Sequence, residues 1–267
     1  MPLLMMSSPI ALTTWLTKLD TLKQELDALR PLPSDVVAQL QKFYRIGLTY
    51  SSNSLEGNTL TEGETKLLLE SGITVGGKPL LHQLEAVGHA EALDALFTAI
   101  QSHQYPTEQQ ITTLHQLLLR KIIPEQASVY RNTGVLITGT PFIPPPASQV
   151  ATLMQKLFTR QLPTWREAYH PIITTALAHQ QFVNIHPFID GNGRIARLLN
   201  NWLLLSEGYP PLSIPLVLRM EYLNALRACQ DIAVSEANTL PLSTFIAEVA
   251  YEGLKDYLRM VNRLLSA

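Results

Sequence analysis

Two stretches of this chain are apolar around almost the whole circumference of a helix, and a strongly polar segment separates them. The stretches run from Ile172 to Val183 and from Ile195 to Leu205. Helices of this kind lie in the middle of a domain, because they offer no polar face to water. A polar loop between them costs free energy unless its groups are paired or used for binding. The chain is therefore expected to fold as helices around a buried polar site.

Helical periodicity also dominates the rest of the chain, which predicts an all-α fold. Apolar residues recur at three- and four-residue spacing, as in amphipathic helices. Thr61 with Glu64 and Thr107 with Gln110 have the spacing of capping boxes, which mark helix starts. The expected helices cover about residues 12–29, 34–47, 61 onward, 81–100, 107–124, 148–161, 171–185, 193–207, 221–236 and 242–265.

One segment breaks this helical pattern. Residues 135–138 are apolar and mostly β-branched, and three prolines follow at 144–146. β-Branched residues favour strands, and proline cannot continue a helix. The pattern predicts a short β-hairpin or an extended flap between about Gly134 and Pro146, standing on the helical body.

Composition narrows the domain organisation and the class of partner. The chain has 267 residues, of which 46% are apolar, so it can bury the core of one large domain or two small ones. The glycine-rich turn at 72–78 is the best candidate boundary, separating an N-terminal helical region (1–75) from a second domain (76–267). The net charge is −2, so the chain as a whole lacks the excess of basic residues that is typical of a nucleic-acid-binding protein.

The same composition predicts a cytoplasmic protein that does not bind a membrane. Cys229 is the single cysteine, so an intramolecular disulfide is impossible, which fits a reducing compartment. The first cation is Lys18, so the basic region of a secretory signal is missing. No apolar run reaches the length of ~18–20 residues that spans a bilayer.

The polar segment begins with two residues suited to phosphate chemistry. His186 precedes Pro187, which biases it away from helical geometry and places it at a helix end. Its imidazole can accept a proton near neutral pH, so it is a candidate general base. Asp190 offers the hard carboxylate oxygen that Mg²⁺ takes together with phosphate oxygens and waters.

The segment ends in a turn and two arginines that favour an anion. Gly191, Asn192 and Gly193 open a helix, where backbone N–H groups and the helix dipole attract negative charge. Arg194 and Arg197 share a face of the first turns, where the dipole disfavours cations. Two guanidiniums at this end of a helix are explained if a polyphosphate occupies the site.

Residues 186–197 match the pattern HPFx(D/E)GNGRxxR at every specified position, so the segment resembles the Fic motif. The likeness extends over roughly Tyr44 to Ala250, and is closest to Fic adenylyltransferases with an N-terminal inhibitory helix. It implies a Fic-type helical bundle with a short β-hairpin flap. It also implies a nucleotidyltransferase that moves AMP from ATP to a hydroxyl of a target protein, and of itself, and releases pyrophosphate.

The resemblance assigns roles to the two reactive side chains. His186 would take the proton of the target hydroxyl as this attacks the α-phosphorus of ATP. Asp190 would hold the Mg²⁺ that bridges the α- and β-phosphates. Both roles agree with the chemistry of the residue types, since nucleotidyl transfer depends mainly on positioning and charge stabilisation.

The resemblance also distributes the phosphates along the motif. Gly191, Asn192 and Gly193 would form the anion hole, with Asn192 on the α-phosphate. Arg194 would meet the β-phosphate and Arg197 the γ-phosphate. Members of the family that transfer phosphate instead of AMP carry lysine at the position of Gly193, so the glycine favours AMP transfer.

A second segment resembles the inhibitory motif (S/T)xxxE(G/N) of the family. It is matched by Ser52, Glu56 and Gly57. The resemblance implies that Glu56 pairs with Arg197, so that this arginine cannot orient the γ-phosphate and the enzyme inhibits itself. A carboxylate is a suitable counter-charge for a guanidinium when no phosphate is present.

Two further groups of residues follow from the resemblance. The flap would pair with the backbone of the target by strand addition, with Phe142 or Ile143 as an apolar clamp. Tyr222 and Gln230 would lie near the adenine, although Gln230 and Leu223 stand where relatives often have asparagine and tyrosine. The flap residues are Val135, Leu136, Ile137, Phe142 and Ile143.

Other functions remain open at this point. The chain could transfer another nucleotide, or bind a nucleotide without catalysis as an interaction protein. Some relatives use the inhibitory glutamate to help remove AMP, so Glu56 could have a part in the reverse reaction. The expected partners are ATP, an unidentified target protein and, by analogy, a second copy of the chain.

Overall fold

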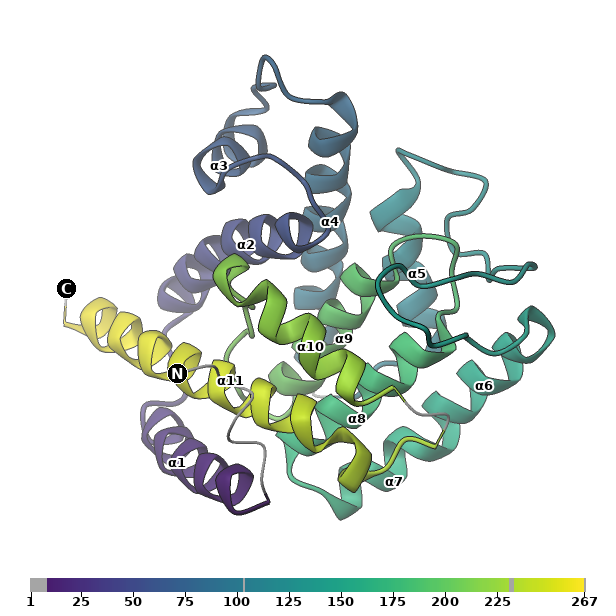
Figure 1. Ribbon diagram of the computed structural model, residues 1–267. Coiled ribbons are helices and arrows are strands. Elements are labelled where there is room, and N and C mark those ends of the chain that lie inside the picture. Colours follow the sequence, from purple (N-terminus) through teal and green to yellow (C-terminus); the bar gives the residue numbers. More distant parts are fainter. Residues whose placement is uncertain (1–8, 103, 231–232, 267) are drawn as a thin grey trace.

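The computed structural model describes residues 9–102, 104–230 and 233–266, and eleven α-helices form among them (Figure 1). The predicted all-α fold is confirmed, because no strand occurs in these ranges. The helices are α1 (Pro9–Ala28), α2 (Ser34–Leu55), α3 (Glu62–Ser71), α4 (Leu80–Ala99), α5 (Glu108–Leu119), α6 (Val150–Lys156), α7 (Leu162–Ala168), α8 (Pro171–Ile185), α9 (Asn192–Ser206), α10 (Arg219–Ala228) and α11 (Glu236–Leu265).

Helices α8 and α9 lie in the middle of the molecule and pack against each other (Figure 1). Phe182 and Ile185 of α8 and Leu199 of α9 are fully buried, and Trp202 of α9 is 2% exposed. This confirms that the two all-round apolar stretches are interior helices. The polar loop between them, residues 186–191, is thus held at both ends by rigid buried elements.

The other helices surround this pair. Helix α11 packs on α8, α10 and α1, whereas α4 packs on α2 and α5. Leu19 and Leu26 of α1 face the core and are fully buried, as the apolar periodicity predicts. The division into regions 1–75 and 76–267 stays a prediction. Among the described residues, no helix combines the length and the hydropathy that a bilayer crossing requires.

Helix α2 extends beyond the end that its apolar pattern predicts. The pattern stops near Gly47, but the helix continues for two more turns to Leu55. The added turns are polar yet buried, and side chains support their own backbone: Asn53 Nδ2 donates to the Thr49 carbonyl at 2.9 Å. Arg219 Nε donates to the Leu55 carbonyl at 2.8 Å and so satisfies the end of the helix.

Other helix boundaries also differ from the prediction, and α5 ends at Leu119 instead of near 124. The run predicted to end at 161 continues to Ala168 through a π-helical turn over Leu157–Gln161. Helix α10 ends at Ala228 instead of 236, and residues 231–232 of that expectation lie outside the described ranges. Helix α11 begins six residues early, because Ser235 caps it by accepting from the Asn238 N–H.

The segment predicted as a β-hairpin forms no strand, so that part of the prediction is corrected to an extended flap. A turn at 138–139 reverses the chain, with Gly139 at φ +84°. The returning arm carries prolines at 141 and 144–146, which have no N–H to donate to a ladder. Instead Arg131 fixes the base of the flap: Nη1 donates to the Thr133 carbonyl at 2.9 Å and Nη2 to the Pro145 carbonyl at 2.5 Å.

The close approach of α4 to α5 gives a test of the packing. A Cβ added at Gly88 would collide with the carbonyl group of Leu118. We therefore expect Gly88→Ala to lower the free energy of unfolding by about 1–3 kcal/mol, as overpacking does. Gly63 in α3 has no neighbour within 4 Å of an added Cβ, so Gly63→Ala should raise it by about 0.5–1 kcal/mol. Urea unfolding compares the two variants, and equal stabilities would contradict the close approach.

Candidate active site

The loop between α8 and α9 is shaped by two residues in the left-handed conformation. His186 ends α8 with φ +48°, and its N–H donates to the Phe182 carbonyl at 3.0 Å. Gly191 precedes α9 with φ +79°, a conformation that glycine adopts without strain. For histidine this conformation is uncommon, and such residues persist where the surroundings impose them. The fold therefore imposes the backbone conformation of His186.

The surroundings of His186 keep its imidazole neutral at neutral pH. The side chain is partly buried, and its backbone carbonyl accepts from Arg131 Nε at 2.7 Å, which links it to the base of the flap. Burial lowers the pKa of His186, and although the Val183 carbonyl opposes this, the net direction is downward. A neutral imidazole at the start of this loop can accept a proton.

Asn192 holds the shape of this loop with its side chain. Its Oδ1 accepts from the Phe188 N–H at 3.0 Å, and its Nδ2 donates to the Phe188 carbonyl at 2.8 Å. Both ends of the amide are thus occupied within the protein, and the residue is 4% exposed. The structure shows Asn192 as a brace of the turn, and its contact with an α-phosphate stays a prediction.

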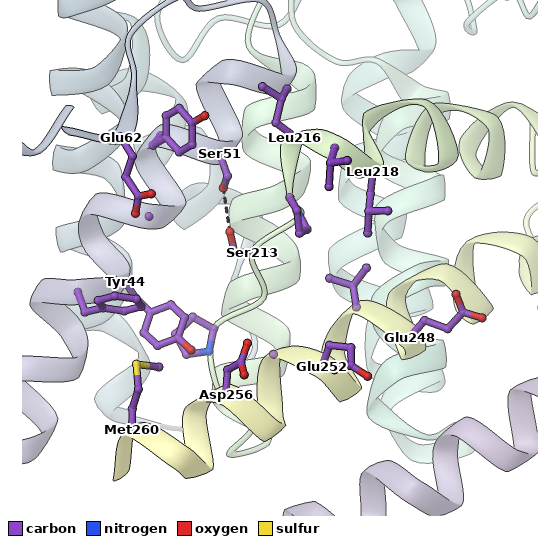
Figure 2. Close-up of a pocket in the computed structure, with 18 of the residues that line it drawn as sticks. Tyr44, Ser51, Glu62, Ser213, Leu216, Leu218, Glu248, Glu252, Asp256 and Met260 are labelled. Carbon is purple, nitrogen blue, oxygen red and sulfur yellow. Dashed lines mark hydrogen bonds between the residues drawn. The ribbon is translucent and has the colours of Figure 1, made fainter. Parts of the chain in front are cut away.

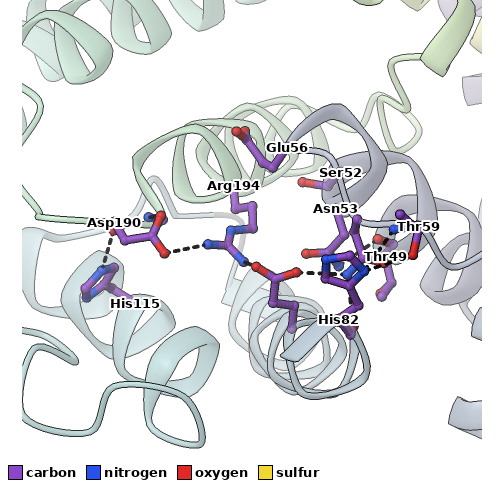
Figure 3. A network of polar contacts seen from close by, with 12 residues as sticks. Thr49, Ser52, Asn53, Glu56, Thr59, His82, His115, Asp190 and Arg194 are labelled. Atoms are coloured by element: carbon purple, nitrogen blue, oxygen red, sulfur yellow. Dashed lines mark hydrogen bonds and ion pairs between the residues drawn. The ribbon is translucent and has the colours of Figure 1, made fainter. Parts of the chain in front are cut away.

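A histidine that the sequence reasoning missed supports the other side of the loop. The His115 ring of α5 stacks on Phe188 with centroids 3.6 Å apart. Its Nδ1 accepts from the Ser128 N–H at 2.9 Å, and its Nε2 lies 3.1 Å from the Asp190 carbonyl (Figure 3). Burial lowers the pKa of His115 to about 4, so the ring is neutral and Nε2 is the donor. No local pattern distinguishes His115, because its partner lies 75 residues away.

Arg194 is held between two carboxylates. Its guanidinium is 3% exposed, with Nη2 at 3.1 Å from Asp190 Oδ2 and Nη1 at 2.9 Å from Glu85 Oε1. Figure 3 shows Arg194 next to Asp190, with the segment around Ser52 and Glu56 close by. Glu85 belongs to α4 and is a second residue that the motif did not reveal. The site therefore brings α4, α9 and the loop together at one arginine.

Arg197 is paired with the segment of Ser52 and Glu56, and this pairing is the one that the resemblance implies. Its Nη2 donates to Glu56 Oε1 at 2.7 Å and to the Ser52 carbonyl at 2.8 Å. Its Nε donates to the Ser52 hydroxyl at 3.0 Å. Arg197 is almost fully buried, whereas the Glu56 side chain keeps 42% of its surface exposed. The residues predicted from two separate motifs thus meet in space.

Glu56 and Arg197 each stabilise the charged form of the other, although burial disfavours both charges. Burial alone would raise the pKa of Glu56, but the charge and hydrogen bond of Arg197 outweigh it and lower that pKa. Burial likewise opposes the charge of Arg197, yet Glu56 leaves the pKa of Arg197 raised. A Cβ added at Gly193 would collide with Glu56 Oε1, so the glycine is what lets the carboxylate reach the arginine. Gly57 follows Glu56 with φ +97° and turns the chain away from α2.

Tyr222 and Gln230, the residues predicted to lie near the adenine, differ in burial. Tyr222 is 3% exposed, and its hydroxyl lies 2.9 Å from Nε2 of the buried His179, so its place near the adenine stays a prediction. Gln230 follows α10, and its side chain accepts a hydrogen bond from the Thr140 hydroxyl of the flap. Of the five predicted flap residues, Leu136 and Ile143 are 82% and 71% exposed, and Val135, Ile137 and Phe142 are partly buried.

A metal ion at this site would need ligands from a substrate. Among the described residues, no three His, Cys, Asp or Glu side chains are grouped so that they could hold one. Asp190, in the loop itself, offers a carboxylate that is 53% exposed, with Oδ1 accepting from the Gly191 N–H at 2.6 Å. One carboxylate completed by phosphate oxygens and waters is a coordination that Mg²⁺ commonly adopts, so the donor set fits Mg²⁺ with a polyphosphate.

A cavity of about 1140 Å³ lies away from this loop, between α2 and α11 (Figure 2). Tyr44, Leu218 and Met260 line it, and the Ser213 hydroxyl donates to the Ser51 hydroxyl at 3.0 Å at its wall. It contains no residue of the 186–197 segment. The cavity is mostly apolar and has no histidine, so it does not share the acid–base chemistry of the loop.

Comparison with known proteins gives consistent matches. A protein-family model described as "Fic/DOC family" matches residues 105–204. The "Protein adenylyltransferase Fic" of Drosophila mojavensis is 32% identical over 243 residues, which cover 90% of this chain and 47% of that protein. The Drosophila melanogaster protein of the same name is 33% identical over 90% of this chain and 48% of its own length. The chain thus spans about half the length of the curated relatives it matches.

Two solved structures share the fold over most of the chain. A Fic domain containing signaling protein from Bacteroides thetaiotaomicron has a TM-score of 0.83 and 28% identity, covering 92% of this chain and 98% of its own. Residues 134–508 of Fic-1 from C. elegans give a TM-score of 0.78 and 26% identity, covering 96% of this chain and 75% of theirs. The likeness therefore includes the helices on both sides of the loop.

Proposed function

This chain belongs to the Fic/DOC family, and we propose that it transfers AMP from Mg-ATP to a hydroxyl side chain of a target protein and of itself, under inhibition by Glu56. One observation carries the proposal. The loop 186–191 presents a half-buried imidazole of lowered pKa beside two buried arginines whose counter-charges are carboxylates. Such an arrangement suits a polyphosphate that replaces the carboxylates and a base that acts next to it.

The proposed reaction uses His186 as the base. The target hydroxyl oxygen forms a bond to the α-phosphorus, and its proton passes to the neutral imidazole. The bond from the α-phosphorus to the oxygen bridging to the β-phosphate breaks, and pyrophosphate leaves with that oxygen. The αL conformation and the Arg131 hydrogen bond fix the position of His186, so little reorganisation precedes the proton transfer.

The remaining side chains would hold and neutralise the triphosphate. Arg194 and Arg197 would bind the β- and γ-phosphates, because both guanidiniums project from the first turns of α9 next to the loop. Asp190 would bind Mg²⁺, which supplies a positive charge to the phosphates and the leaving group when it is bound. The α9 N-terminus adds backbone N–H groups on the same side.

Glu56 would act as the brake on this site. Its carboxylate accepts a hydrogen bond from Arg197 Nη2 at 2.7 Å, and a γ-phosphate would need that same donor. The half-exposed side chain at the end of α2 could leave without disturbing the core. The geometry supports inhibition in cis.

Glu56 could also take part in removing AMP from a modified target. Incubating the wild type with a pre-modified target and measuring free AMP tests this reverse reaction.

The flap is proposed to hold the target. Leu136 and Ile143 are exposed apolar side chains on its two arms, and Arg131 fixes its base to the His186 carbonyl. A target segment lying along the flap would therefore stand at a fixed distance from the base. Gln230 accepts a hydrogen bond from Thr140 of the flap, so a nucleobase bound at Gln230 would lie next to the flap.

The pH dependence of transfer follows from the direction of the His186 pKa. Burial lowers this pKa below the ordinary imidazole value of ~6.5, and only the neutral ring can accept the proton. We expect kcat/KM of the Glu56→Gly variant to stay constant from pH 8 down to about 6.5 and to fall only below it. A decline that already begins above pH 7 would contradict the neutral base.

The group that is transferred decides the function. The Glu56→Gly variant is incubated with a lysate and with ATP labelled at the α- or the γ-phosphorus. We expect protein label from α-labelled ATP only, which identifies AMP transfer. Parallel reactions with α-labelled GTP and UTP test transfer of another nucleotide. Nucleotide-dependent thermal stabilisation without any covalent label would instead identify a nucleotide-binding interaction protein.

A further inference from the structure

Arg194 has a counter-charge that lies outside the motif, and the two carboxylates beside this arginine differ in kind. Asp190 is in the loop, is 53% exposed and lies 3.1 Å from Nη2. Glu85 comes from α4, is 16% exposed and lies 2.9 Å from Nη1. Because Arg194 itself is 3% exposed, its charge depends on partners within the protein.

Glu85 is held in place by a second hydrogen bond. Its Oε2 accepts from Asn58 Nδ2 at 2.9 Å, while Oε1 faces Arg194. Asn58 is fixed in turn, because its Nδ2 also donates to the His82 carbonyl at 2.9 Å and its Oδ1 accepts from the Leu60 N–H at 3.0 Å. Both carboxylate oxygens of Glu85 therefore have partners, which orients the carboxylate toward the arginine.

This arrangement differs from that of Glu56, although both glutamates pair with an arginine of the site. Glu56 caps the end of α2, is 42% exposed and accepts a hydrogen bond from Arg197, so it can leave when a phosphate arrives. Glu85 lies inside α4, and its departure would break two hydrogen bonds at a nearly buried position. A phosphate is therefore expected to displace the first glutamate and not the second.

We propose that Glu85 is a positioning residue for Arg194, which it holds through Nη1 while the rest of the guanidinium faces the β-phosphate. This inference rests on the proposed function, in which the Asp190 carboxylate would hold Mg²⁺. Arg194 then loses its contact at Nη2, and Glu85 remains as the partner that keeps the guanidinium oriented. Arg194 Nε is buried with no acceptor among the described residues, so a donor is left for a ligand.

The test measures nucleotide affinity in the Glu56→Gly background, so that the brake does not interfere. Glu85→Ala should weaken binding of Mg-ADP by about ten- to hundredfold, as expected for a charge-assisted hydrogen bond that orients the ligand's partner. AMP has no β-phosphate, so its affinity should change less than about twofold. Glu85→Gln keeps a hydrogen-bond acceptor without the charge, so its Mg-ADP affinity should lie between those of the parent and of Glu85→Ala. Isothermal titration calorimetry measures the affinities of the parent and of both variants for Mg-ADP and AMP.

Two controls separate positioning from structural damage. Glu91 on the same helix pairs with Arg120 and Lys121 at 2.8 and 2.7 Å, so Glu91→Ala removes a comparable ion pair outside the site and should leave Mg-ADP affinity unchanged. In transfer assays Glu85→Ala should raise KM for ATP by the same factor as the loss of ADP affinity, with kcat reduced less than about threefold.

Three results would overturn the inference. The first is an unchanged Mg-ADP affinity in Glu85→Ala. The second is a tighter affinity, which would make Glu85 a competitor like Glu56. The third is an equal loss for ADP and AMP, which would show a structural role. If the Glu56→Gly parent itself neither bound Mg-ATP nor transferred AMP, the proposed function would fail instead, and the two failures are therefore distinct.

Discussion

Replacing His186 with alanine is expected to lower the rate of AMP transfer by about 10²–10⁴-fold, the usual contribution of a positioned general base. His115, the other histidine at the loop, donates Nε2–H to the Asp190 carbonyl and accepts at Nδ1 from Ser128, so both of its nitrogens are engaged. The loss should therefore appear almost entirely in kcat.

Nucleotide binding is the control for this variant. The His186 backbone conformation is set by its N–H and carbonyl hydrogen bonds to Phe182 and Arg131, which alanine keeps. Affinity for Mg-ATP should therefore stay within about threefold of the parent in the Glu56→Gly background, and single-turnover labelling gives the rate. A variant that still transferred AMP at a tenth of the parent rate would exclude His186 as the base.

Much of this site is predictable from local sequence, because its key residues lie within twelve positions. The spacing of His186, Asp190, Arg194 and Arg197 along a loop and one helix face sets their relative positions once α8 and α9 are known to be interior helices. The two capping boxes at Thr61 and Thr107 are likewise present as predicted. Such features depend on neighbours three or four residues apart, which a sequence displays directly.

The parts that escaped prediction depend on contacts between distant segments. Glu85 is 109 residues from Arg194 and His115 is 75 from Asp190, and each lies in a helix whose local pattern is ordinary. The Glu56–Arg197 pair, 141 residues apart, was anticipated only through a family resemblance. The contact of the buried Tyr222 with His179, 43 residues away, is likewise tertiary and has no local pattern.

The two arginines have counter-charges that differ in exposure, and the proposed function would use this difference. A buried guanidinium without a counter-charge would be costly, so each needs a carboxylate in the free protein. Arg197 receives a displaceable carboxylate from the end of α2, and Arg194 receives a fixed one from the interior of α4. In the proposed function, inhibition and preorganisation would thus use the same type of ion pair and would differ in the exposure and hydrogen bonding of the carboxylate.

Removing the displaceable carboxylate should have the second large effect. We expect Glu56→Gly to raise self-labelling by α-labelled ATP by about ten- to hundredfold, since the arginine loses a competitor bound by a charge-assisted hydrogen bond. Glu56→Gln keeps the shape and a hydrogen-bond acceptor but not the charge, so it should show a smaller increase. Glu91→Ala removes a carboxylate outside the site and should leave labelling at the wild-type level.

Thermal unfolding separates this explanation from a general loosening of α2. Without Glu56 the buried Arg197 keeps its hydrogen bonds to Ser52 but loses its carboxylate counter-charge, so the free variant should unfold at a lower temperature than the wild type. Mg-ATP should stabilise the variant more than the wild type, because the γ-phosphate replaces the missing counter-charge and does not have to displace one. Equal labelling of the two proteins, or equal stabilisation by Mg-ATP, would show that the Glu56–Arg197 pair does not control access of the nucleotide to this arginine.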